Sequence, residues 1–283
     1  MTAQRHREAP PLPEPVGVLA LSLTALALAG CVSPLAALRS SRQLTAGSAS
    51  YALRWSDGDD AEQLRVSRAL ERAAPGLERW GGLREPVTIN LVPTHADLEV
   101  AVRRPGFGWL RAWARYDDVV LQSPRTWSAV GANDADVDEL VLHEVTHCLL
   151  FQRSATRDTW LEREIPLWFR EGMATWTAGQ GYRFPSLDDL SRWLLAHPEL
   201  DPFGDGERLS RDAFAEVYAA AFHAFAYLVQ HHGEASVKAT MAQMNGGQNF
   251  STAFGAAVGQ PLPAFVKEFV DFVRLGKFRG AGR

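Results

Sequence analysis

Two histidines four residues apart, with a glutamate between them, restrict the fold of this chain more than any other feature. They lie in the segment His143-Glu144-Val145-Thr146-His147, which apolar residues flank on its C-terminal side. Residues i and i+4 lie on the same face of an α-helix, so the two imidazoles can bind one metal ion. The glutamate between them can then reach water at that ion and act as a general base. An ordinary core position explains these residues poorly, because burying three such groups without partners is costly.

The residues around this motif predict a helix from about residue 136 to residue 153. Asn133 and the acidic residues that follow it provide an N-cap and a negatively charged first turn. Apolar residues before and after the motif provide enough surface for a buried helix. One of only two cysteines, Cys148, follows the motif and is expected to be a small buried hydrophobic residue.

Glu171 is the candidate for a third metal ligand. A catalytic zinc site has three protein ligands and keeps a fourth position for water. Pro166 suits the first turn of a helix, which places Glu171 on the second turn among apolar residues. The residues alone leave two interpretations open, a metal ligand or a solvated carboxylate paired with Arg163 or Arg170.

The order and spacing of two motifs resemble the gluzincin zinc metallopeptidases. H-E-x-x-H is followed after a short connection by W-x-x-E-G-x-A, which comprises Trp168, Glu171, Gly172 and Ala174. The likeness is greatest to the envelope-associated, peptidase MA-like branch and extends from about residue 87 to residue 273. It implies an α+β, zincin-like fold, with a small mixed sheet and the active-site helix in an N-terminal lobe and only helices in a C-terminal lobe.

The resemblance also implies the roles of the site residues. His143, His147 and Glu171 would bind one Zn²⁺ ion, and Glu144 would be the catalytic base. Some gluzincins carry an aspartate four residues after the ligand glutamate, where it orients a zinc-bound histidine. This chain has Thr175 there, whose hydroxyl can accept a hydrogen bond from an imidazole but brings no charge.

A donor to the developing oxyanion is expected on a later helix, because acyl transfer benefits from one. Residues 210–232 have helical periodicity and are followed by Gly233, which predicts a helix that ends there. Tyr218 matches the tyrosine of the resembling families, and His223 is the reserve candidate. The alternative for Tyr218 is a core residue, since a single tyrosine at helical spacing is usually that.

The first thirty residues resemble a bacterial lipoprotein signal peptide. Arg5 and Arg7 precede an apolar run, residues 16–30, that is shorter than the roughly 20 residues of a membrane-spanning helix. The run ends in Leu28-Ala29-Gly30-Cys31, which resembles a lipobox. We therefore expect cleavage before Cys31, lipid attachment to its thiol, and a location in the bacterial cell envelope outside the cytoplasm. An uncleaved anchor and a coincidental cysteine are the alternatives.

The rest of the chain divides into a tether at residues 31–48, an N-terminal α+β lobe at 49–180 and a helical lobe at 181–283. Strands are expected at residues 49–55, 86–92 and 118–122, and helices at 59–80 and 94–102. The last of these strands is expected to be the sheet edge beside the metal, where it would pair with a substrate backbone. The aromatic and glycine residues of 103–116 could form a flap over the substrate, but a core-covering role is the favoured interpretation.

Composition limits the classes of function. With 33 acidic and 29 basic residues the chain carries a net charge of −4, and no basic patch predicts nucleic-acid binding. The leading hypothesis is an envelope-anchored metallopeptidase that hydrolyses peptide bonds. The alternatives are a peptidase fold used as a binding or assembly module of the envelope, and a zinc hydrolase of a non-peptide amide. No motif indicates the substrate or the oligomeric state.

Overall fold

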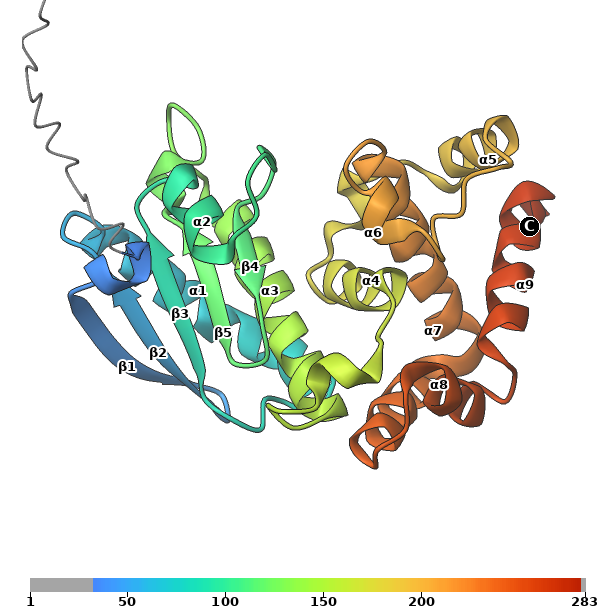
Figure 1. Cartoon of the computed structure of the whole chain (residues 1–283), viewed down its shortest axis with the longest axis horizontal. Helices are drawn as coiled ribbons and strands as arrows, with labels where there is room; N and C mark the ends of the chain where they lie inside the picture. The colour runs from blue at the N-terminus through green and yellow to red at the C-terminus, as the bar shows by residue number, and fades with distance from the viewer. Residues whose placement is uncertain (1–32, 281–283) are drawn as a thin grey trace, which may run out of the picture. The chain divides into compact units, whose positions relative to one another are not determined.

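The computed structural model describes residues 33–280 of the chain (Figure 1). The expected signal peptide and the lipidation site at Cys31 lie outside these residues. Within residues 33–280, no helix has both the length and the apolar character that crossing a membrane requires. The described residues belong to one compact unit that combines a single sheet with a larger number of helices.

The sheet is small and mixed, as the family resemblance implied. Its strands are β1 (Ser40–Ala46), β2 (Ala49–Trp55), β3 (Val87–Val92), β4 (Ala112–Ala114) and β5 (Asp118–Gln122). They lie in the order β1-β2-β3-β5-β4. The three central strands are parallel, and the outer strands β1 and β4 each run antiparallel to their neighbour. The structure thus confirms an α+β fold.

Two sets of helices cover the two faces of this sheet (Figure 1). Val119 and Leu121 of β5 point into the main core, which also contains the buried sides of α1 (Asp60–Glu78) and α3 (Asp134–Ser154). Val120, which lies between them, points to the other face and packs with α2 (His95–Val102) in a smaller apolar cluster. This alternation is the period-2 pattern from which the strand was predicted.

The prediction of a tether at residues 31–48 is wrong for most of its length. Residues Pro34–Ala37 form a 3-10 helix, and β1 pairs along its whole length with β2. β1 is an outer strand whose residues Ser41, Arg42 and Gln43 are exposed. Its backbone pairing stabilises it, not a buried face, so it carries no apolar period that sequence analysis can detect.

The prediction of the edge strand is also wrong. β5 lies inside the sheet between β3 and β4, and the outer strand on the side of α3 is β4. β4 has only three residues and lies within the glycine- and aromatic-rich segment 103–116. A strand that short shows too little alternation to be recognised.

The part of the chain after residue 181 contains only helical elements and loops up to residue 280, as predicted. The helix expected at residues 210–232 begins later, at Phe214, and its predicted end at Gly233 is confirmed. Gly233 has the non-helical angles φ 73° and ψ 163°, so α7 consists of two helices that meet at a kink there, and the second continues to Asn245. The main elements are α5 (Leu187–Ala196), α6 (Gly206–Leu209), α7 (Phe214–Asn245), α8 (Phe250–Val258) and α9 (Leu262–Arg274).

A glycine allows the helix that carries Glu171 to lie close against α7. This helix, α4 (Leu167–Thr177), has Pro166 at its N-cap. A Cβ atom at Gly172 would lie 2.7 Å from the Cβ of Phe225 and closer still to the backbone oxygen of Ala221. Such distances are sterically impossible, so only glycine permits this helix–helix distance. The glycine of the W-x-x-E-G-x-A pattern therefore fixes the position of the neighbouring glutamate relative to α7.

Candidate metal centre

One face of α3 forms the floor of a cavity of about 820 Å³. Asn133 caps the helix by accepting a hydrogen bond from the backbone N–H of Asp136. Helical spacing then places a single row of side chains along the cavity, and this row comprises Asp136, Leu140, His143, Glu144, His147 and Phe151. Cys148 is fully buried and does not line the cavity, as predicted.

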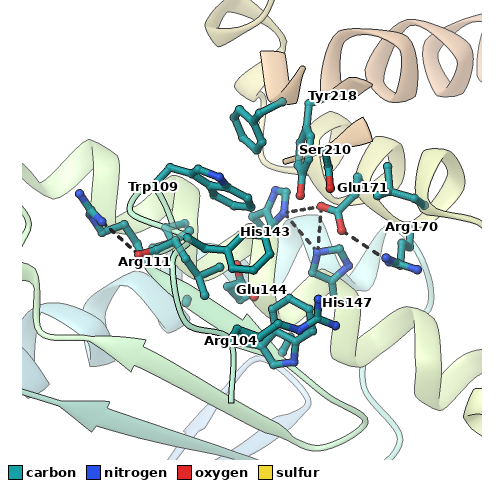
Figure 2. Close-up of a pocket in the computed structure, with 18 of the residues that line it drawn as sticks. Arg104, Trp109, Arg111, His143, Glu144, His147, Arg170, Glu171, Ser210 and Tyr218 are labelled. Carbon is teal, nitrogen blue, oxygen red and sulfur yellow. Dashed lines mark hydrogen bonds and ion pairs between the residues drawn. The ribbon is translucent and has the colours of Figure 1, made fainter. Parts of the chain in front are cut away.

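The two histidines and Glu171 converge on one point, as Figure 2 shows. The Nε2 atoms of His143 and His147 lie 3.2 Å apart. The Oε2 atom of Glu171 lies 3.4 Å from the first and 3.5 Å from the second. Ligands at 2.0–2.1 Å from a tetrahedral zinc ion are separated by roughly 3.3 Å, so the three atoms have the spacing of one face of such a site. This donor set therefore fits a zinc ion.

Charge and burial act against each other on these side chains, all of which are buried. Burial alone would raise the pKa of Glu171, but the two imidazoles lower it to well below its usual value. Burial lowers the pKa of His143, but Glu171, Glu144 and Gln180 outweigh this and leave it raised. Two buried carboxylates beside two imidazoles therefore form a group that could hold a metal ion.

Glu144 faces the cavity from the same helix. Burial raises the pKa of its carboxyl group, although both imidazoles and a backbone hydrogen bond from Ala114 of β4 lower it. A carboxylate in these surroundings holds a proton more tightly than an exposed glutamate does. It is therefore suited to take a proton from water inside the cavity.

Gln180, which the sequence analysis did not identify, makes the hydrogen bond to the first histidine. Its Oε1 atom lies 2.8 Å from the Nδ1 atom of His143. An acceptor at this position keeps the hydrogen on Nδ1 and leaves Nε2 free to bind a metal. Gln180 follows Gly179, whose φ of 69° turns the chain back after α4. That glycine is the one local signal that could have pointed to it.

The structure contradicts the expectation that Thr175 orients a histidine. The Oγ1 atom of Thr175 is buried and has no hydrogen-bond partner among the described residues, and the same is true of Nδ1 of His147. The expectation relied on helical spacing from Glu171. The imidazole of His143 instead reaches beyond the end of α4 to the turn that carries Gln180.

The carboxylate of Glu171 lies near both the two imidazoles and Arg170, so the metal-ligand and the arginine-paired interpretations each describe part of its environment. One carboxylate oxygen, Oε2, faces the imidazoles, while Oε1 lies 3.5 Å from Nε of Arg170. Arg170 also forms an ion pair with Glu207. Arg170 therefore lies against Oε1, and Oε2 is the oxygen that faces the two imidazoles.

Tyr218 lies on the wall opposite the helix α3, and its side chain points toward Glu171 beside Ser210 (Figure 2). Burial and the charge of Glu171 raise the pKa of Tyr218 well above its usual value, so the phenol stays protonated and can donate. His223, the reserve candidate, does not reach the site. Its Nε2–H donates to the backbone oxygen of Pro185 at 2.9 Å, and it does not line the cavity.

The aromatic residues of the segment 103–116 both cover a core, as the sequence favoured, and line the cavity. Leu110 is buried in the smaller cluster beside α2, and Phe107 and Trp113 pack against that cluster. Phe107, Trp109 and Trp113 also contribute to the wall of the cavity.

Comparison with known proteins gives limited similarities. No protein-family model matches the chain. The uncharacterized protein YhcO of Bacillus subtilis (strain 168) is 23% identical over 130 residues, which make up 46% of this chain and 39% of that protein. Among solved structures, the crystal structure of Legionella pneumophila aminopeptidase A in complex with aspartic acid matches with a TM-score of 0.47 and 19% identity. That match covers 81% of this chain and 27% of the aminopeptidase chain, so this chain spans less than half of either protein.

Proposed function

We propose that this protein is a zinc-dependent peptidase of the gluzincin type. The observation that carries the proposal is the buried group of His143, His147 and Glu171, whose ligand atoms all lie within 4.8 Å of one another. Glu144 adds a carboxylate beside them that a site used only for binding a metal does not need. The free cavity around them is large enough for several residues of a peptide.

The side chains have distinct roles in the proposed hydrolysis. His143, His147 and Glu171 would hold a zinc ion, which would supply Lewis acidity that makes water more acidic and polarises a carbonyl group. The Glu144 carboxylate takes a proton from water as the water oxygen adds to the peptide carbonyl carbon. It then gives that proton to the amide nitrogen as the C–N bond breaks, which yields a carboxylic acid and an amine. The phenol of Tyr218 donates a hydrogen bond to the carbonyl oxygen, on which negative charge develops.

Replacing Glu144 with Gln tests this proposal, with Glu162→Gln as the control. Glu162 is exposed and does not line the cavity. We expect Glu144→Gln to abolish hydrolysis of a peptide library while zinc remains bound at one ion per chain, and Glu162→Gln to match the wild type. Unchanged turnover in Glu144→Gln would refute the mechanism. A zinc-loaded wild type that cleaves no peptide but hydrolyses another amide would refute the peptide substrate and leave the metal centre intact.

We further propose that the mature protein is anchored in the bacterial cell envelope by a lipid on Cys31. The proposal is supported by the apolar run of residues 16–30 and by Leu28-Ala29-Gly30-Cys31 at its end. A chain with Cys31→Ser should no longer incorporate a labelled fatty acid and should leave the membrane fraction. Equal incorporation of label by both chains would contradict lipid attachment at this residue.

A further inference from the structure

A loop between α2 and β4 joins two walls of the cavity. We call residues 103–111 the bridging loop. The ring centroid of Trp109 lies 4.3 Å from that of Phe214 and 6.2 Å from that of Tyr218, both on α7. The guanidinium of Arg211 lies 5.0 Å from the ring of Phe107. The bridging loop belongs to the sheet side of the cavity, whereas Arg211, Phe214 and Tyr218, which it contacts, belong to the helical side.

The bridging loop is fixed firmly only on its own side. The carboxylate of Glu99 on α2 accepts hydrogen bonds from the backbone N–H groups of Gly106 and Phe107, at 2.7 and 3.2 Å. Leu110 is buried in the cluster beside α2. Within residues 33–280, no hydrogen bond or ion pair connects the bridging loop to residues 210–218. The contact across the cavity therefore consists of aromatic and cation–π interactions, which are individually weak.

This contact borders the cavity that contains the proposed metal ligands. Trp109, Phe214 and Tyr218 line it together with His143, His147 and Glu171. Trp109 is 40% exposed as a residue, so it is not a core residue. On the sheet side the cavity is bounded by the outer strand β4, whose residues Ala112 and Ala114 line it. An outer strand offers room for one further extended chain beside it.

We propose that the bridging loop determines the class of polypeptide that reaches the site: flexible, linear segments enter, and segments held in a folded loop are excluded. One extended chain needs about 4.8 Å of width beside a strand, whereas a folded loop carries two chains side by side and needs at least twice that. The contact between Trp109 and Phe214 limits that width. The inference rests on the proposed peptidase function and adds a substrate class to it.

The test compares one peptide in two forms. A linear peptide that the wild-type protein cleaves internally, with both ends blocked, is prepared again with a lactam bridge spanning the cleaved bond. Rates of cleavage of both forms are measured for the wild type, Trp109→Ala and Arg211→Ala. Phe278→Ala is the matched control, because its ring contacts Phe272 and does not line the cavity. Thermal unfolding of each variant establishes that it is folded.

We expect the wild type to cleave the linear form faster than the bridged form. Loss of one aromatic contact changes an equilibrium constant by up to about tenfold. Trp109→Ala should therefore raise the ratio of the cleavage rate of the bridged form to that of the linear form by about two- to tenfold. Arg211→Ala should raise it in the same direction, and Phe278→Ala should leave it unchanged. Equal rates on both forms by the wild type, or an unchanged ratio in both loop-contact variants, would overturn the inference. Absence of any zinc-dependent cleavage would instead overturn the proposed peptidase function.

Discussion

Replacing Gln180 tests whether a neutral amide sets the metal affinity of this site. Its Oε1 atom is the hydrogen-bond partner of Nδ1 of His143, at 2.8 Å. Gln180→Ala removes that acceptor and leaves a buried Nδ1–H unpaired, so the imidazole can adopt the other tautomer or rotate. Loss of such a partner typically costs 10- to 100-fold in metal affinity, or about 1.4–2.8 kcal/mol. Gln180→Glu keeps the acceptor and adds a negative charge, which should tighten zinc binding.

The assay is equilibrium competition for zinc between the purified protein and a coloured chelator. Thr175→Val is the matched control, because Thr175 on α4 is also buried but its hydroxyl has no hydrogen-bond partner among residues 33–280. We expect Gln180→Glu to bind zinc most tightly and Gln180→Ala to bind it most weakly. The wild type and Thr175→Val should have equal affinities between these two. A zinc Kd of Gln180→Ala within about twofold of the wild type would refute the argument from orientation. A weaker affinity in Thr175→Val would show that the threonine acts through a contact that the structure lacks.

Three further predictions concern the donor, the metal and pH. Tyr218→Phe should lower kcat by about 10²- to 10³-fold with an unchanged zinc Kd, whereas His223→Gln should leave kcat unaltered, as steady-state kinetics can determine. Zinc at a free concentration of about 100 times its Kd should stabilise the folded protein by about 2.7 kcal/mol, so a chelator should lower Tm. The same Tm with and without the chelator would argue against a structured metal site. Burial and carboxylate partners raise the pKa values of Tyr116 and Tyr227 to about 12 in the folded protein, against about 10 when unfolded. Because both values are raised, this contribution to stability is complete below pH 10 and is lost as the pH rises from about 10 to about 12. Urea unfolding across that range should show the loss, and Tyr227→Phe should reduce it.

The sequence predicted best those elements that have one buried face. β2 was predicted at its observed bounds because Tyr51, Leu53 and Trp55 alternate with more exposed residues. The helix α3 was predicted to within two residues because Asn133 caps it. The spacing of His143, Glu144 and His147 on one helix also indicated the proposed site. In each of these cases local periodicity decides which way a side chain points. Glu171 was added by the resemblance of its motif, because the residues alone left two interpretations open.

The features that the sequence did not reveal depend on contacts between distant segments. β1 and β4 exist because they pair with neighbouring strands, and neither buries an alternating set of side chains along its length. Gln180 reaches His143 because α4 crosses near α3, and no spacing rule connects those two residues. The position of Trp109 beside Phe214 likewise joins residues that lie about a hundred positions apart. Such pairs become visible only when the segments are placed in space.

The close contact at Gly172 has a consequence for the modularity of the protein. A fragment that ends at residue 180 would keep both histidines, Glu144, Glu171 and Gln180, and would look complete as a list of functional residues. It would nevertheless lack α7, against whose backbone Gly172 packs. The residue next in sequence to the third ligand would then face solvent, and α4 would keep its contacts with α3 but lose the surface of α7 against which Gly172 packs. The helical half therefore helps to position the proposed metal ligands. Insertion or exchange of helices there should weaken metal binding even when all three ligand residues are kept.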